Sequence, residues 1–121
     1  MAVTFTETTT GHLTKKIKAV WLSDSDGAAT GTTTYTYDGV LISFTSIPDG
    51  GGTAPTAAYD LTLTDSNSQD LLQGAGADRS ATATEYLNFS DGLSAVSEEK
   101  LTLTVANAGE AKGGTVYFTI I

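Results

Sequence analysis

The chain has 121 residues and no cysteine, which excludes disulfide scaffolds, thiolate metal sites and cysteine nucleophiles. Fourteen acidic residues stand against six basic ones, and the formal net charge of −8 disfavours non-specific binding to nucleic acid or to an anionic membrane surface. The length fits a single domain, 1–121, and an apolar share of 40% lets that domain bury a core without disulfides or metals.

No apolar run reaches the length of about 20 residues that crosses a bilayer, so we expect no membrane-spanning segment. Residues 1–5 lack the basic start and the apolar run of a secretory signal. Together with the absence of cysteine, these features favour a protein that is made and folded in a reducing cytoplasm.

Apolar and polar residues alternate with a period of two along most of the chain, which predicts strands. The first run, residues 3–6, puts Val3 and Phe5 on one face. The second run, residues 13–22, has an apolar face with Leu13, Ile17, Ala19 and Trp21 and a polar face with Thr14, Lys16 and Lys18. Lys15 falls on the apolar face, where its long stem can reach solvent. Residues 23–27 are rich in Ser, Asp and Gly and predict a turn.

The next region contains the strongest local signal in the sequence. Residues 32–37 and 40–47 alternate as strands do, and the dipeptide Asp38-Gly39 between them suits a type I′ turn. A hairpin with this turn would pair Tyr37 with Val40 and Tyr35 with Ile42, which are favourable cross-strand pairs. The sequence therefore predicts a hairpin here.

The rest of the chain predicts further strands separated by polar segments. We expect strands at residues 59–64, 81–89, 101–105 and 116–120, an ordered loop anchored by Leu71 and Leu72 at 65–80, a turn at 90–92, a loop or brief helix at 94–99, and a hairpin loop at 107–114. The total of about seven or eight strands predicts an all-β, single-domain antiparallel β-sandwich or jelly-roll-like barrel.

Patterns that could carry catalysis or bind a metal are incomplete. His12 is the only histidine, and no Gly-x-Ser-x-Gly motif accompanies it. The segments 24–27 and 65–70 contain the oxygen ligands that calcium prefers, but neither completes an EF-hand pattern, and Asp, Asn, Ser and Gly are also ordinary turn residues. Residues 74–77 lack the rest of a phosphate-binding loop and predict a bend. We therefore expect no enzyme activity and no cofactor.

Lysines and aromatic residues give the clearest indication of a binding surface. Lys15, Lys16 and Lys18 are half of the basic residues. They could form a positive patch that docks on an acidic partner, or they could protect an edge strand from unwanted pairing, the interpretation that the sequence favours. Among the aromatic residues, the alternation predicts that Trp21, Tyr35, Tyr37 and Tyr59 lie in the core and that Tyr86 and Tyr117 are exposed.

The middle of the chain resembles a pattern found in small structural proteins of tailed bacteriophages. The segments that carry the resemblance are YDLTLTDSN at 59–67, DLL at 70–72, GAGADRS at 74–80 and TATE at 82–85. The whole chain, which is short and rich in Thr, Gly and Ala, is similar to capsid decoration (cement) proteins.

The resemblance implies a non-enzymatic virion protein that binds the major capsid protein on the capsid surface and stabilises the lattice. It implies a homo-oligomer, with a trimer as the expected state, made in the host cytoplasm. Residues 1–10 would be an extended N-terminal arm that adds a strand to a neighbour. The candidate partner-binding residues are then Thr4, Thr6, Lys15, Lys16 and Lys18.

Two other non-enzymatic functions fit the same composition. The chain could be a carbohydrate- or receptor-binding β-module of a tail fibre or adhesin, because tyrosine and tryptophan favour interfaces. It could also be a tail-tube or head–tail connector subunit. Neither alternative requires a cofactor.

Overall fold

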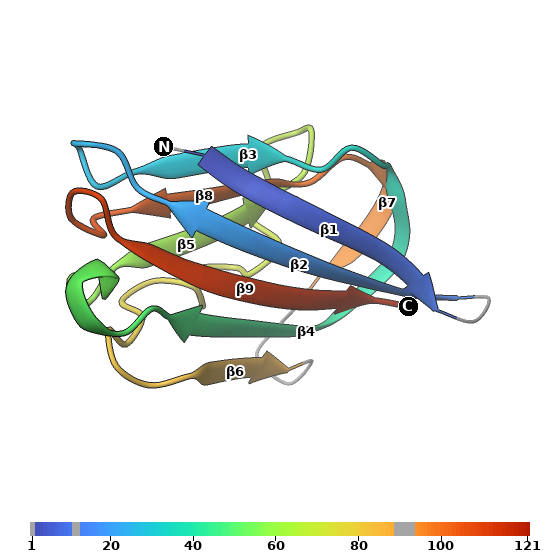
Figure 1. Ribbon diagram of the computed structural model, residues 1–121. Helices are drawn as coiled ribbons and strands as arrows, with labels where there is room; N and C mark the ends of the chain where they lie inside the picture. The colour runs from blue at the N-terminus through green and yellow to red at the C-terminus, as the bar shows by residue number, and fades with distance from the viewer. Residues whose placement is uncertain (1, 11–12, 89–93) are drawn as a thin grey trace.

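The computed structural model describes residues 2–10, 13–88 and 94–121 of the protein, and these residues form a β-structure (Figure 1). The strands are β1 (Ala2–Thr10), β2 (Thr14–Leu22), β3 (Ala29–Thr32), β4 (Tyr37–Pro48), β5 (Asp60–Thr64), β6 (Glu85–Asn88), β7 (Ala95–Glu99), β8 (Thr102–Ala106) and β9 (Gly113–Ile120). The only helical element in the described part is one 3-10 turn, η1 (Gly51–Thr53). None of the described residues belongs to a helix that could serve as a membrane span.

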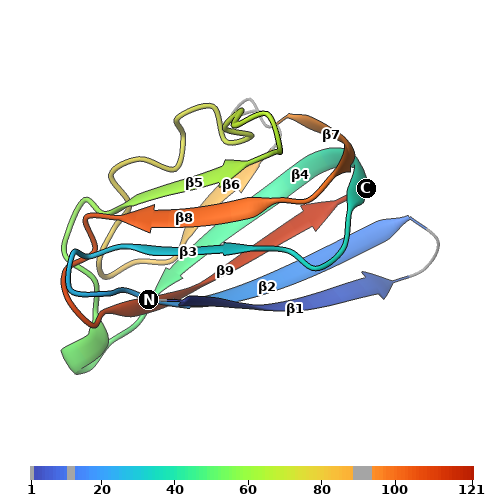
Figure 2. The same ribbon diagram turned by 90° about the horizontal axis from the view of Figure 1, so that it is seen from above.

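The strands form one curled sheet in the order β5-β8-β3-β1-β2-β9-β4-β6, and β7 pairs with β4 off this path. The only link between β1 and β3 is a parallel pair, Ala2 with Thr30. The sheet curls at this junction, so that β5-β8-β3 faces β2-β9-β4 (Figure 1 and Figure 2). We call β3-β8-β5 the small layer and β1-β2-β9-β4-β6 the large layer. The predicted all-β fold is confirmed.

The core lies between the two layers and follows the predicted alternation. The large layer contributes Ile17, Ala19, Trp21, Val116, Phe118 and Ile120, and the small layer contributes Leu61, Leu63, Leu103 and Val105, all buried. Trp21 packs on Tyr59 with ring centroids 5.5 Å apart, which joins the layers. Each fully buried Leu, Ile, Val or Phe side chain contributes about 1.5–3 kcal/mol, so this set is the main source of stability.

The loop between β5 and β6 is anchored as predicted. Leu71 and Leu72 are fully buried, and the Leu71 amide donates to the carbonyl of Leu63. The carbonyl of Gly76 accepts a hydrogen bond from the Leu61 amide, so residues 70–76 cover the outer edge of β5. Because this edge is covered, β5 does not present free backbone groups to another strand.

The predicted hairpin at Asp38-Gly39 is wrong. β3 ends at Thr32, and β4 runs through Asp38 and Gly39 without turning. Asp38 does not have the positive φ that a type I′ turn requires, and Gly39 lies at a register shift of β4 with φ of 131°. A Cβ atom at Gly39 would lie 2.2 Å from the carbonyl oxygen of Ile121, so glycine is needed there for a close approach of two strands.

Residues 33–36 instead carry the chain from the small layer to the large layer. The buried Thr33 hydroxyl donates to the carbonyl of Tyr35 and accepts from the amide of Leu101, at 2.9 and 3.0 Å. Tyr35 is 63% exposed, so its predicted place in the core is wrong. Tyr37 is buried as predicted.

Three further predictions are corrected by the pairing of strands. Residues 94–99 were expected as a loop or brief helix, but β7 pairs with β4. Residues 107–114 join β8 and β9, which belong to different layers and do not form a hairpin. The strand expected at 81–89 begins only at Glu85, as β6, because the Ser80 hydroxyl accepts from the amides of Thr82 and Ala83 and bends the chain. The turn expected at 90–92 lies outside the described residues.

Candidate partner-binding face

The outer face of the large layer, opposite the core, collects the side chains most suited to binding. The residues that point outward alternate with the buried ones and lie side by side on five strands. We call this set the large-layer face; it comprises Thr4, Thr6, Thr8, Lys16, Lys18, Val20, Ser43, Thr45, Ile47, Tyr86, Asn88, Thr115, Tyr117 and Thr119.

One row of this face contains most of its chemistry. The strand register places Thr6, Lys18, Tyr117, Thr45 and Tyr86 next to one another across β1, β2, β9, β4 and β6. The Nζ atoms of Lys16 and Lys18 lie 5.3 and 5.9 Å from the centroid of the Tyr117 ring. A cation over a tyrosine ring is worth about 0.5–1 kcal/mol at an exposed site, so Tyr117 holds both ammonium groups over the sheet.

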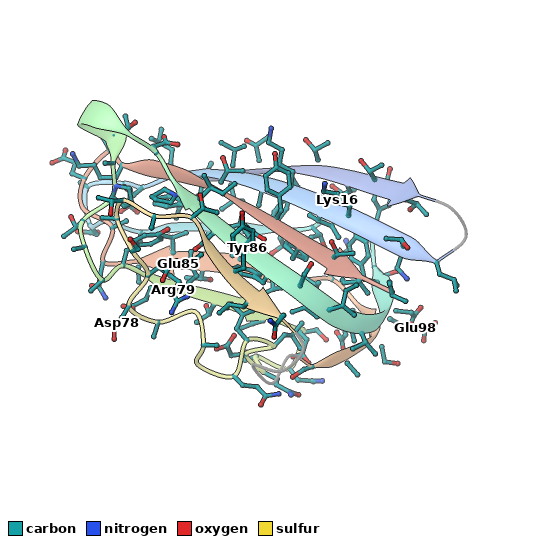
Figure 3. All side chains as sticks on the ribbon, turned by 90° about the horizontal axis from the view of Figure 1, so that it is seen from below. Lys16, Asp78, Arg79, Glu85, Tyr86 and Glu98 are labelled. Carbon is teal, nitrogen blue, oxygen red and sulfur yellow. The ribbon has the colours of Figure 1, made fainter. Side chains whose placement is uncertain are left out.

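A groove of about 370 Å³ runs between the two tyrosines. It is lined by Tyr86 and Tyr117, by Lys16, and by the hydroxyl residues Ser43, Thr45 and Thr119. Tyr86 is 74% exposed, the most exposed large apolar side chain among the described residues. Figure 3 shows Tyr86 and Lys16 on this face. An exposed aromatic ring beside a cation and several hydroxyls is a surface suited to recognition.

None of the described residues that make up the large-layer face is a carboxylate, although the chain has fourteen acidic residues. The carboxylate of Asp49 lies beyond this set, beside Gly113 at the start of β9. Glu85 belongs to β6 but pairs with Ser46 on the other side of the sheet, where it lies 3.7 Å from Arg79 and accepts from the amide of Ser80. Asp78 and Glu98 lie away from Lys16 and Tyr86, toward the margins of the view (Figure 3). The face is therefore locally positive on a protein whose net charge is −8.

The structure brings together four of the five candidate residues predicted from the sequence. Thr4, Thr6, Lys16 and Lys18 all lie on the large-layer face. Lys15 points to the other side, where its Nζ donates to the carbonyl oxygen of Asp38 at 2.7 Å. The interpretation of the lysines as edge protection is wrong, because β2 lies between β1 and β9. Residues 2–10, expected as an extended arm, pair with β2 along their whole length.

A second cavity, of about 280 Å³, lies beneath the β1–β2 pair and is lined by Glu7, Lys15, Tyr35 and Tyr37 among others. The Glu7 carboxylate accepts hydrogen bonds from the amides of Thr34 and Tyr35 and from the hydroxyl of Tyr37, at 3.0, 3.2 and 2.6 Å. Partial burial acts to raise the pKa of Glu7, but these hydrogen bonds outweigh it and hold the pKa below its usual value.

Burial and the neighbouring Glu7 charge raise the pKa of Tyr37 above its usual value, so this hydroxyl stays protonated and donates. The carboxylate of Glu7 is thus fully occupied in holding residues 33–36 to β1, and we assign it a structural role.

The aspartate-rich loops show turn chemistry. Asp24 accepts from the amides of Asp26 and Ala28, which lowers its pKa, and Asp65 accepts in the same way from Asn67 and Gln69. In the described ranges no three His, Cys, Asp or Glu residues are grouped so that they could hold a metal ion. His12 lies outside the described residues.

Sequence reasoning did not connect Tyr86 and Tyr117 with the lysines. Both tyrosines were predicted to be exposed; this is confirmed for Tyr86, whereas Tyr117 is half-buried beside the lysine side chains. The connection depends on β9 lying between β2 and β4, which no local pattern indicates. Comparison of the chain with known protein families finds no matching family, and comparison with curated proteins finds no match either.

Proposed function

We propose that the protein is a non-enzymatic virion protein that decorates a bacteriophage capsid and uses the large-layer face to bind an acidic region of the major capsid protein. The observation that carries the proposal is the composition of this face: two lysines, two tyrosines and a set of threonines without a carboxylate, on a chain of net charge −8. The resemblance of residues 59–85 to phage structural proteins supplies the kind of partner.

Electrostatics favour one orientation of docking. The overall negative charge of the protein repels an acidic surface, whereas Lys16 and Lys18 lie side by side with Tyr117 on the large-layer face and attract it. Approach through this face is therefore the favourable one. Tyrosine is enriched where protein interfaces are energetically important, and Tyr86 is exposed next to this charge. Charge would thus select the face, and the aromatic rings would add affinity.

The size of the face suits a weak contact that is repeated many times. Five strands about 4.8 Å apart span roughly 19 Å, and the outward residues of each long strand extend over four residue steps of about 3.3 Å, or roughly 13 Å. This is about a third of the roughly 800 Å² that each partner buries in a standard interface. A single copy would therefore bind weakly, and stable attachment would come from neighbouring copies on a regular lattice.

The experiment is rebinding of the purified protein to capsids from which it has been removed. Lys16→Glu/Lys18→Glu should lower the affinity by about a hundredfold or more, because like charges then face each other in the contact. Lys100→Glu/Lys112→Glu is the matched control, since it changes the net charge equally at positions away from the face. Its affinity should stay close to that of the unaltered protein.

Two results would contradict the proposal. Failure of the unaltered protein to rebind would remove the capsid as partner. An equal loss of affinity in both double variants would show that the net charge of the protein controls binding to the capsid, and that the large-layer face does not.

The groove between Tyr86 and Tyr117 favours a second candidate function, a saccharide-binding module. Aromatic walls and a lining of hydroxyls are what a sugar ring needs for stacking and hydrogen bonding, and both occur together here. Binding of the isolated protein to a glycan array, lost in Tyr86→Ala, together with no rebinding to capsids, would favour this function over decoration.

A further inference from the structure

The outer edge of β1 has almost no backbone partner. β1 pairs with β2 along nine residues but meets β3 only at Ala2 and Thr30, because β3 turns away to pair with β8. Among the described strands, none pairs with this edge beyond Ala2, and Figure 2 shows β1 as the outermost strand of the large layer. A strand in this position presents unpaired N–H and C=O groups that can accept another strand.

Most of the devices that protect such an edge are missing from β1. Natural edges are blunted by lysine, proline, bulges or an inward-pointing charge. β1 has the sequence AVTFTETTT, without lysine or proline, and its register with β2 has no shift. Glu7 does point inward, but its carboxylate is occupied by the amides of Thr34 and Tyr35 and by the hydroxyl of Tyr37. The edge is therefore open to pairing.

We propose that the β1 edge pairs antiparallel with the β1 edge of a second copy of this chain, around a two-fold axis at Thr6. In this register Thr4 lies opposite Thr8 of the second copy, and Glu7 lies opposite Phe5. A register centred one residue later would place two Glu7 side chains opposite each other, which costs free energy. An isologous contact of this kind closes at two copies.

The small layer shows that the chain uses this kind of contact. Across the antiparallel strands β3 and β8, the hydroxyl of Thr30 lies 3.3 Å from that of Thr104, and the hydroxyl of Thr32 lies 2.8 Å from that of Thr102. Thr4, Thr6 and Thr8 present the same side chain at alternate, exposed positions of β1. Pairing of two β1 strands would repeat the threonine ladder between copies, and this self-complementarity selects a second copy as the occupant.

The dimer would join two large-layer faces side by side into one. If the proposed function holds, two copies would then present four lysines of this face to the partner lattice and bind together more strongly than either alone. The pairing itself does not rest on that function, because it uses the edge of β1 and not the lysines or tyrosines.

Salt should affect the dimer and the partner complex in opposite directions. Two chains of net charge −8 repel each other, and salt screens this repulsion over a Debye length of about 8 Å at physiological ionic strength. Association of two copies should therefore strengthen as salt is added, whereas binding of the lysines to an acidic partner should weaken.

Sedimentation velocity of the purified protein over a range of concentrations, at low and high salt, tests the proposal. The protein should dimerise, with a shift toward dimer at high salt. Thr6→Lys should raise the dissociation constant at least about tenfold, because two lysines would face each other at the two-fold axis. Thr115→Lys adds the same charge to the same face on the central strand β9 and should leave dimerisation unchanged.

Amide hydrogen exchange at low and high protein concentration gives a second readout that does not depend on a variant. Protection should increase with concentration in residues 4–8 and nowhere else in the described strands. A protein that stays monomeric at every concentration and salt, a trimer, or a dimer that is equally strong with Thr6→Lys would overturn the proposal. Thr6 is exposed, so circular dichroism should show that Thr6→Lys folds normally; Thr8→Lys serves in its place if it does not.

Discussion

The outer faces of the two layers have the same period but different chemistry. On the small layer the outward residues of β3, β8 and β5 are mostly threonines, namely Thr30, Thr32, Thr62, Thr64, Thr102 and Thr104. Asp60 and Ala106 lie at one end of this face. Two of its neighbouring hydroxyl pairs lie within hydrogen-bond distance of each other. The large-layer face has the same threonine background, with Lys16, Lys18, Tyr86 and Tyr117 added.

This difference shows that threonine alone makes an adequate solvated sheet face. Thr suits a half-buried pleated surface, and its hydroxyls satisfy one another or water. The large-layer face carries long lysine and tyrosine side chains that such a surface does not require, and none of its described residues is acidic, although the chain has fourteen acidic residues. The small layer thus serves as an internal control for what the fold needs, and the additions mark the surface available for binding.

The largest effect should come from the core that both faces share. Trp21→Ala should lower the free energy of unfolding by about 3–5 kcal/mol, because Trp21 is buried and packs on Tyr59 across the core. Chemical denaturation followed by circular dichroism and by tyrosine fluorescence should still give one coincident transition. If amide hydrogen exchange in Trp21→Ala became faster in the large layer only, the two layers would unfold separately, and their faces could not be compared as parts of one cooperative unit.

The second effect compares the two faces directly. Tyr86→Ala/Tyr117→Ala should weaken partner binding by about 2 kcal/mol, close to thirtyfold, because exposed aromatic residues dominate interfaces. Thr62→Ala/Thr104→Ala on the small layer is the control and should leave the affinity unchanged. The measurement is the affinity for stripped capsids, obtained by titrating the protein into them at a fixed salt concentration. An equal loss with the small-layer variant would show that the additions to the large layer do not select the binding face.

The third effect concerns Glu7, where the crossing between layers is attached to β1. Glu7→Gln should lower the free energy of unfolding at neutral pH by about 1–2 kcal/mol, since three hydrogen bonds to a partly exposed carboxylate are weakened. Because the pKa of Glu7 is lowered in the folded state, its contribution is present above the ordinary glutamate pKa of about 4.3 and is lost as pH falls through the folded value.

The pH profile checks the sign of this contribution. The difference in unfolding free energy between the unaltered protein and Glu7→Gln should be constant near neutral pH and should shrink below about pH 4. Asp24 and Asp60 also have lowered pKa values, through hydrogen bonds from Ala28 and Asp26 and from Asp78 and Asn107, but they are present in both proteins. A difference that grew with acidity would contradict the assigned role of Glu7.

Local alternation was enough to predict which residues of most strands are buried. In residues 13–22, Ile17, Ala19 and Trp21 are buried as expected, and only Leu13, at the strand start, is exposed. The alternation is reliable there because, in a two-layer fold, a strand with one apolar face buries that face between the layers. The same reasoning correctly predicted the exposure of Tyr86.

Strand pairing could not be predicted from the sequence in the same way. Asp38-Gly39 has ideal composition for a two-residue turn, but β4 continues through it, because Gly39 is needed for the approach to Ile121. The constraint comes from Ile121, more than eighty positions away along the chain, and the residues around the dipeptide give no information about it. For the same reason the sequence indicated the lysines and the tyrosines separately, but not that β9 joins them into one face.

The smallest effect tests the control face itself. Thr32→Val removes one hydroxyl of the pair with Thr102, at 2.8 Å, and keeps the β-branched shape. It should lower the free energy of unfolding by about 0.2–1 kcal/mol, the usual worth of a cross-strand pair, and leave partner binding unchanged. The double-mutant cycle with Thr102→Val isolates the pair energy, because Thr32 is exposed, Thr102 is half-buried and the valine side chains keep the same shape. A coupling energy near zero would show that solvent satisfies these hydroxyls equally well. The threonine pairs of the small layer would then no longer support the pairing of two β1 strands. The contrast between the two faces would remain, because it rests on Lys16, Lys18 and Tyr86.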